Sequence, residues 1–207
     1  HGAQVRKLDL SIDTFPEFID AGNNVKKTLA FDFNGTNYKI PVTVNRQLVS
    51  YFEYYPLTDL PVFFTASFSP ATGSSLIQGL KETTRNMDEL TAVNFLLRMV
   101  QKSFQYKTDQ DNFDREKYML PEETLFYTYS DCDDRSILFA TLVREVLGME
   151  VVGLRYSRHL ATAVRFNETV DGDFHMVGSQ KFTVADPTYI NAPVGLTMSS
   201  YKNESPK

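Results

Sequence analysis

Several common features are missing from the chain, and each absence excludes a class of protein. Among 207 residues there is a single cysteine, Cys132, so no disulfide can form within the chain and any thiol chemistry must take place at this residue. No apolar run approaches the roughly 20 residues that a membrane-spanning helix needs. The net charge is −5, which argues against a nucleic-acid-binding protein, because binding phosphates needs clustered lysine and arginine. Tryptophan is absent too.

The composition that remains is that of a folded protein. Hydrophobic residues make up 42% and aromatic residues 13% of the chain, enough for a substantial core. The length fits one large domain, or one domain with an elaboration. Residues 1–4 lack the basic and apolar parts of a signal peptide, so we interpret them as a processed start. The polar tail at 202–207 leaves open whether the natural chain is longer.

The first third of the chain has the alternating pattern of strands. Apolar and polar residues alternate over 5–12, 28–33, 38–44 and 62–68. The turn sequence NGTN at 34–37 predicts a hairpin between two of these segments. We therefore expect a β-rich elaboration over residues 1–85, packed on a core domain. The aromatic run at 51–55 favours core packing over a ligand platform.

The rest of the chain predicts helices followed by strands. A capping pattern of Asn86 and Glu89 and apolar residues at helical spacing predict a helix up to about residue 104. Residues 109–117 are charged and predict a surface loop, and a second helix runs from about 131 to 147. Strands follow at 150–156, 159–166 and 181–186. This order indicates an α+β fold, with a core domain over 86–207.

Cys132 lies where a helix is predicted to begin. Residues 129–136 read YSDCDDRS, in which Ser130 is a good N-cap and Asp133 can return the capping bond. In the first helical turn, free N–H groups and the helix dipole lower a thiol pKa and can receive an oxyanion. The acidic neighbours oppose thiolate formation, so a histidine cation must supply the activation. The alternative is a buried structural cysteine, although such residues usually lie in apolar sequence.

Two strands offer the partners of a thiol nucleophile. His159 opens one strand, and Asp186 ends another before Pro187. If the strands pair around a turn at 171–174, His159 and Asp186 lie opposite each other, with Cβ atoms about 5 Å apart. The carboxylate then orients the imidazole, whose other nitrogen takes the thiol proton. A competing turn at 178–179 would break this register into a three-stranded meander, and the sequence leaves that choice open.

The runs at 130–136, 158–164 and 184–189 together resemble the transglutaminase-like superfamily, and more closely proteins of Bacteroidetes-type bacteria. The resemblance covers about residues 88–198. It implies a papain-related fold, with a catalytic helix packed on an antiparallel sheet. It also implies Cys132 as nucleophile, His159 as base and Asp186 as orienting carboxylate. Ser130 replaces the glycine that many relatives have.

Many relatives also carry an upstream aromatic residue that assists the oxyanion. Because the chain has no tryptophan, the candidates for this role are Gln101, Tyr129 and Tyr127.

No metal or cofactor is expected. The acidic residues at 131, 133 and 134 lack the glycine and distal glutamate of a calcium loop, so a solvated helix start explains them better. A zinc site is not expected either, because the chain lacks the several cysteines or clustered histidines that bind zinc. We interpret Arg135 as a structural salt-bridge partner of a nearby aspartate.

The expected chemistry is acyl transfer through a thioester on Cys132. A peptidase or amidase acting on a peptide, protein or peptidoglycan-like substrate is preferred, because the resemblance favours hydrolysis. An amine acyltransferase is one alternative, and a non-catalytic binding module of the same fold is another. The resemblance suggests a periplasmic or secreted protein. The sequence names neither the substrate nor the oligomeric state.

Overall fold

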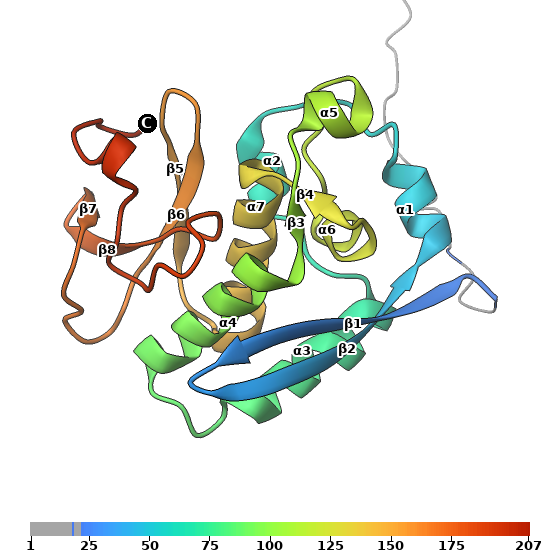
Figure 1. The fold of residues 1–207 in the computed structure, drawn as a ribbon, viewed down its shortest axis with the longest axis horizontal. Helices are drawn as coiled ribbons and strands as arrows, with labels where there is room; N and C mark the ends of the chain where they lie inside the picture. The colour runs from blue at the N-terminus through green and yellow to red at the C-terminus, as the bar shows by residue number, and fades with distance from the viewer. Residues whose placement is uncertain (1–17, 19–21) are drawn as a thin grey trace, which may run out of the picture.

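A computed structural model describes residue 18 and residues 22–207, so the strand predicted at 5–12 lies outside the described residues. The first elements form a hairpin and a group of helices (Figure 1). In chain order they are β1 (Asn24–Phe33), β2 (Thr36–Asn45), α1 (Arg46–Phe52), α2 (Leu60–Phe64), α3 (Pro70–Thr84) and α4 (Glu89–Ser103).

The second half contains the main helix and a sheet. Its elements are β3 (Gln105–Tyr106), α5 (Asp109–Phe113), α6 (Pro121–Phe126), β4 (Tyr129–Ser130), α7 (Cys132–Leu142) with a π-helical continuation (Val143–Leu147), β5 (Val151–Arg155), β6 (Leu160–Val164), β7 (Phe174–Val177), β8 (Gln180–Ala185) and a 3-10 turn (Ser199–Tyr201). Helices and strands are both abundant, so the expected α+β class is confirmed. None of the described helices is long and apolar enough to cross a bilayer.

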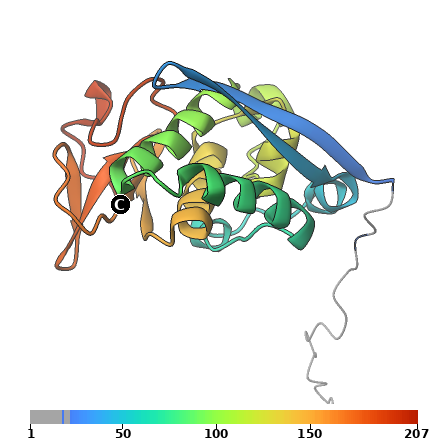
Figure 2. The same ribbon diagram turned by 90° about the horizontal axis from the view of Figure 1, so that it is seen from below.

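The predicted hairpin is present. Asn34 and Gly35 have φ of 48° and 77°, the left-handed pair of a two-residue turn, and Phe33 pairs with Thr36 across it. One face of the hairpin is buried against α4, where Phe95 makes edge contacts with Phe31, Phe33 and Tyr38. Figure 2 shows the hairpin lying along the helices, with the four-stranded sheet to the left of them.

The prediction of a strand at 62–68 is wrong, because α2 occupies the first half of this segment. Pro61 sits in the first turn of α2, where its missing N–H costs nothing and its fixed φ favours a helix. The core packing expected of the aromatic run at 51–55 is also wrong in part, since the Tyr54 side chain is 76% exposed. The region expected to be β-rich therefore holds one described hairpin followed by three helices.

The main hydrophobic core joins elements from both halves of the chain. Leu29 and Val42 of the hairpin and Leu76 of α3 belong to the same buried cluster as Leu97 of α4 and Leu138 of α7. The expected boundary at residue 85 falls at the C-cap of α3, and the division into 1–85 and 86–207 stays a prediction.

Four antiparallel strands form the sheet, in the order β5-β6-β8-β7. β7 and β8 are joined by a tight turn at 178–179, whereas the tight turn predicted at 171–174 is absent and a longer loop leads from β6 to β7. β6 nevertheless pairs with β8, so the alternative three-stranded meander is not formed either. Thr162 pairs with Ala185, which shifts the predicted partner of Asp186 by two residues, from His159 to Ala161. Because side chains alternate with a period of two, this shift keeps His159 and Asp186 on one face.

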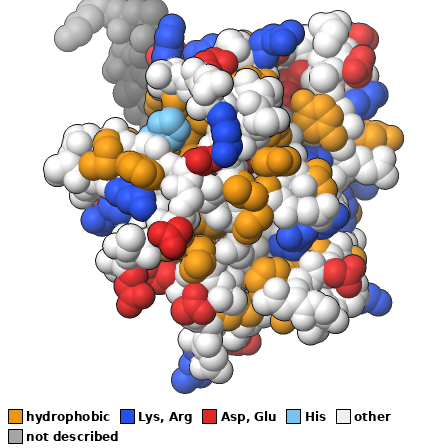
Figure 3. All heavy atoms as spheres, turned by 60° about the vertical axis from the view of Figure 1, so that its left-hand side comes forward, with side chains coloured by type: hydrophobic (Ala, Val, Ile, Leu, Met, Phe, Trp, Pro, Cys, Tyr) orange, Lys and Arg blue, Asp and Glu red, His pale blue; other side chains and the backbone are white. Residues whose placement is uncertain are grey.

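The outer side of this sheet carries exposed apolar side chains. Phe174, Met176 and Val177 of the edge strand β7 are each about half exposed. Figure 3 shows apolar side chains on this side of the molecule interspersed with charged ones, without one large continuous patch.

Candidate active site

The first turn of α7 presents the cysteine. Asp131 is the N-cap, in an extended conformation, and its carboxylate accepts the N–H groups of Asp133 at 3.0 Å and Asp134 at 3.4 Å. The Asp134 carboxylate accepts the Asp131 N–H in return, at 3.1 Å. This capping box lies one residue later than the predicted pair of Ser130 and Asp133. Cys132 is therefore the first residue of the helix, as its predicted role requires.

Ser130 and Arg135 instead tie α7 to the two short strands before it. The buried Arg135 donates from Nε to Ser130 Oγ at 3.1 Å and from Nη2 to the Phe104 carbonyl at 2.9 Å. The predicted structural role of Arg135 is thus correct, but its hydrogen-bond partners are a hydroxyl and a carbonyl rather than an aspartate.

The sulfur of Cys132 lies in a partly buried, acidic environment. Its Sγ is 3.8 Å from Asp133 Oδ1, and the Leu160 N–H points to it as a hydrogen-bond donor. Burial raises the pKa of the thiol, and the charges of Asp133 and Asp131 raise it further. The acidic neighbours oppose thiolate formation as the sequence indicates, and together with burial they outweigh the helix dipole, so the thiol is protonated at neutral pH.

His159 and Asp186 form the pair that the sequence predicts. His159 Nε2 lies 2.8 Å from Asp186 Oδ2, and the two residues are 8% and 2% exposed. The other carboxylate oxygen, Oδ1, accepts the N–H groups of Thr188 at 2.9 Å and Tyr189 at 3.2 Å. Because both oxygens are engaged, the carboxylate has a fixed orientation, and Nδ1 is the ring nitrogen that remains for a proton from the thiol.

Residue 160 links the cysteine to the histidine strand. Ser136, one turn after Cys132, donates from Oγ to the Leu160 carbonyl at 3.0 Å, while the Leu160 N–H points to the Cys132 sulfur. The first turn of α7 is thus fixed against the residue that follows His159. Between the ring of His159 and Sγ of Cys132, both described, there is no hydrogen bond. The resting structure therefore pairs His159 with Asp186 and holds Cys132 beside their strand.

Of the three oxyanion candidates, Gln101 and Tyr129 differ in their surroundings, and the role of Tyr127 stays a prediction. Gln101 is buried, and its side-chain nitrogen bonds the carbonyls of Asp186 at 3.1 Å, Tyr189 at 2.9 Å and Ala192 at 3.0 Å. Its donors are committed, so an oxyanion role for Gln101 is wrong, and it instead fixes the loop after Asp186. A glutamine on the apolar stripe of α4 is the sequence signal for such a role. Tyr129 is 37% exposed beside the Lys107 ammonium, and its role stays a prediction.

A cluster of buried carboxylates lies under the helix start. Oxygen atoms of Asp109, Asp131 and Asp134 lie within 4.8 Å of one another, a spacing that a metal ion would fit. Each of these side chains, however, accepts backbone N–H groups: Asp109 from Lys117 and Asp134 from Met119, both at 2.8 Å. These bonds give the carboxylates a structural role in closing loops. Asp109 was expected on a charged surface loop, and its burial corrects that expectation.

This cluster and the neighbouring Asp133 make stability depend on pH. Burial, with the charge of nearby Asp131, raises the pKa of Asp109 to about 7 and that of Asp133 to about 7. A carboxyl group whose pKa is higher in the folded state stabilises the fold at acidic pH, and the effect is lost as pH rises from about 4 to about 7. We expect the free energy of unfolding to fall by about 2 kcal/mol per group between pH 5 and pH 8. Urea denaturation at the two pH values measures this.

The matched variants are Asp109→Asn and, as a control, Asp59→Asn, because Asp59 is exposed and makes no capping bond. Asp109→Asn is expected to reduce the difference between pH 5 and pH 8, whereas Asp59→Asn leaves it unchanged. Equal stability of the wild-type protein at both pH values would contradict this account of the cluster.

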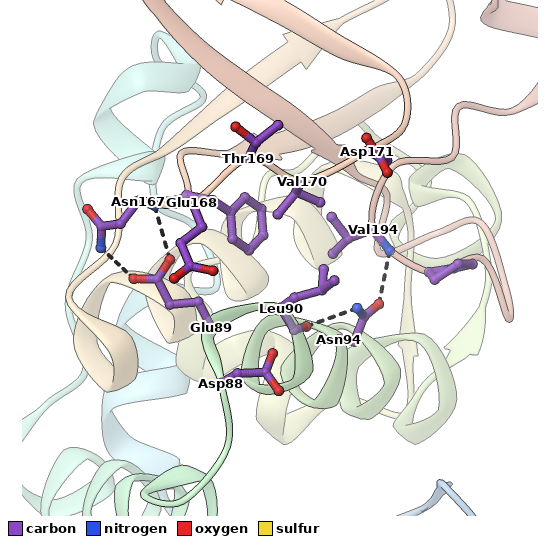
Figure 4. Close-up of a pocket in the computed structure, with 12 residues that line it drawn as sticks. Asp88, Glu89, Leu90, Asn94, Asn167, Glu168, Thr169, Val170, Asp171 and Val194 are labelled. Atoms are coloured by element: carbon purple, nitrogen blue, oxygen red, sulfur yellow. Dashed lines mark hydrogen bonds between the residues drawn. The ribbon is translucent and has the colours of Figure 1, made fainter.

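A cavity of about 680 Å³ lies between the start of α4 and residues 166–171 (Figure 4). None of the three predicted catalytic residues lines it. Two of its acidic side chains already have hydrogen-bond partners: Asp88 caps α4 through Thr91, and Glu89 accepts the backbone N–H and the side-chain amide of Asn167. The cavity is therefore separate from the candidate catalytic residues.

The arrangement expected from the resemblance is present: a cysteine on the first turn of a helix, packed against an antiparallel sheet that carries a paired histidine and aspartate. No protein-family model and no curated protein matches the sequence. Among solved structures, the chain is similar to a proposed cysteine protease from Cytophaga hutchinsonii, with a TM-score of 0.41 and 12% identity over 81% of this chain and 64% of that one. It is also similar to a transglutaminase, with a TM-score of 0.38 and 15% identity over 92% of this chain and 53% of that one. The chain thus spans less than two thirds of either structure.

Proposed function

We propose that this protein is a thiol acyl-transfer enzyme that hydrolyses peptide-like bonds through Cys132, His159 and Asp186. The observation that carries the proposal is the buried His159–Asp186 pair, at 2.8 Å, together with Leu160, the residue after His159, whose N–H points to the Cys132 sulfur. A histidine held by a carboxylate beside a thiol at a helix start is the arrangement that nucleophilic cysteine catalysis needs.

The raised pKa of the thiol determines the order of the steps. Because Cys132 rests protonated, its proton must leave during the attack, and Nδ1 of His159 is the acceptor. Resting sites often hold these groups loosely, so substrate binding must bring Sγ and Nδ1 within reach. The sulfur forms a bond to the carbonyl carbon, and the carbonyl π electrons move to the oxygen.

The tetrahedral intermediate then collapses to a thioester. The C–N bond breaks, and the leaving amine takes the proton from the His159 imidazolium. Water, deprotonated by His159, attacks the thioester, and the thiolate leaves and recovers the proton. The Asp186 carboxylate stabilises the imidazolium in both halves of the cycle.

The oxyanion needs donors at the start of α7. The Asp131 carboxylate already accepts the N–H groups of Asp133 and Asp134, which removes them from this role. The N–H of Cys132 is the helix donor that remains, and the Tyr129 hydroxyl is the side-chain candidate.

Hydrolysis is preferred over transfer to an amine, because water is present at about 55 M in an open site and an amine must be bound to compete.

The test offers a peptide and peptidoglycan-fragment library to the protein, with and without a primary amine, and identifies products by mass spectrometry. Cys132→Ser is the matched control. We expect hydrolysis products that require Cys132. Amine adducts in excess of hydrolysis products would assign the protein to the acyltransferases. Products in neither arm, despite labelling of Cys132 by a small electrophile, would favour the binding module.

A further inference from the structure

The end of the described chain is fastened to the turn that carries His159. We call residues 197–207 the C-terminal strap. The strap begins where the Thr197 N–H donates to Asp173 Oδ2 at 2.9 Å. It ends where Lys207 and Arg155 exchange two backbone hydrogen bonds, at 3.0 and 3.2 Å, at the outer edge of β5 (Figure 1).

Between these two ends the strap holds the β5–β6 turn itself. The Glu204 carboxylate accepts both the N–H and, at 3.0 Å, the hydroxyl of Ser157. The Tyr201 hydroxyl donates to the Arg158 carbonyl at 3.4 Å. Ser157 and Arg158 are the two residues immediately before His159, so the strap fixes the backbone from which the imidazole projects.

Tyr201 also contacts the imidazole directly. Its ring stacks on His159, with centroids 5.1 Å apart and planes inclined by 16°. The ring centroid of Tyr156, the residue that follows β5, lies 5.1 Å from that of Tyr201, and the Tyr156 ring is nearly parallel to that of His159. The imidazole therefore has Asp186 at one edge and a tyrosine ring on its face.

We propose that Tyr201 is a positioning residue for His159, an inference that rests on the proposed function. One hydrogen bond to Asp186 fixes the position of Nε2 but leaves the ring free to swing about that atom. A flat contact on the ring face removes this freedom and keeps Nδ1 directed to one place. The same face stabilises the imidazolium that forms when His159 takes the thiol proton.

The test measures the rate at which iodoacetamide alkylates Cys132 at pH 7, so it needs no knowledge of the substrate. Tyr201→Ala and Tyr201→Leu are expected to slow alkylation about tenfold, because the ring of His159 loses its orientation. Tyr201→Phe keeps the stacked face and is expected to stay within about twofold of the wild-type rate. Tyr51→Ala, at an exposed aromatic residue of α1, is the matched control and should alkylate at the wild-type rate.

The same tyrosine variants are then made in a His159→Gln background. If Tyr201 acts through the imidazole, Tyr201→Leu should have no further effect there, because coupled residues are not additive. An equal loss in both backgrounds would mean general loosening of the fold and would overturn the inference. If Cys132 is alkylated at the wild-type rate in Tyr201→Leu but slowly in His159→Gln alone, the inference is overturned and the proposed function stays intact. An unchanged rate for His159→Gln alone would overturn both.

Discussion

Replacement of His159 by alanine is expected to slow the alkylation of Cys132 at neutral pH by about 100-fold, because positioned general bases contribute 10²–10⁴-fold. The thiol is partly buried beside two aspartates that raise its pKa, so little thiolate exists without a base. His159, oriented by Asp186, is the base that the geometry provides. The measurement is the rate of iodoacetamide labelling of Cys132, followed by intact-protein mass.

The chain offers a matched control for this variant. His175 lies on β7, where its Nε2 is 3.5 Å from the Tyr156 hydroxyl, and neither a hydrogen bond nor an ion pair joins it to Asp186. His175→Ala should alkylate at the wild-type rate. Because His159 is buried, His159→Gln, which keeps more of the side-chain volume, guards against loss of folding. Equal labelling rates for wild type and both folded His159 variants would show that the thiol is not activated by this residue.

Asp186→Asn is expected to have an effect of similar size, lowering turnover of a substrate found in the library assay by about 10²–10⁴-fold. The reason is the direction of the hydrogen bonds around the side chain. The N–H groups of Thr188 and Tyr189 both point to Oδ1, so the single oxygen of an asparagine would stay there. Its amide nitrogen would then face Nε2 of His159, forcing that nitrogen to be the acceptor and giving the proton to Nδ1. The wrong tautomer cannot accept the thiol proton.

Asp171→Asn is the control for this change, because Asp171 is exposed and lies in the loop between β6 and β7. It removes the same charge from the same part of the chain without contact to His159. Turnover by a folded Asp186→Asn protein within a few-fold of wild type would rule out an orienting carboxylate at this position.

The parts of the site that the sequence predicts are those with local signals. Short polar residues before an apolar periodic run place Cys132 at a helix start, and the end of a strand before a proline places Asp186. The pairing of His159 with Asp186 also follows from alternation along strands. The predicted register was wrong by two residues, because the loop between β6 and β7 is not the tight turn assumed, and the shared face survives only because the shift is even.

The residues whose roles the sequence does not predict make their contacts with residues far away in the sequence. Gln101 reaches the loop after Asp186 from α4, and Asp109 joins the carboxylates beneath α7. Tyr201 reaches His159 from the end of the chain. No local pattern distinguishes these side chains from ordinary helical or surface residues, because their partners are set by the packing of whole elements. The raised thiol pKa has the same origin, since burial outweighs the effect of the helix start.

The most direct test of the central claim is to trap an acyl group on the protein with p-nitrophenyl acetate. The account predicts a burst of p-nitrophenolate close to one equivalent per chain, with the acetyl group found on Cys132 by peptide mapping. The burst should be much slower in His159→Gln and absent in Cys132→Ser. A burst of the same rate in wild type and His159→Gln, or acetylation that does not involve Cys132, would contradict the assignment of Cys132 as a nucleophile activated by His159.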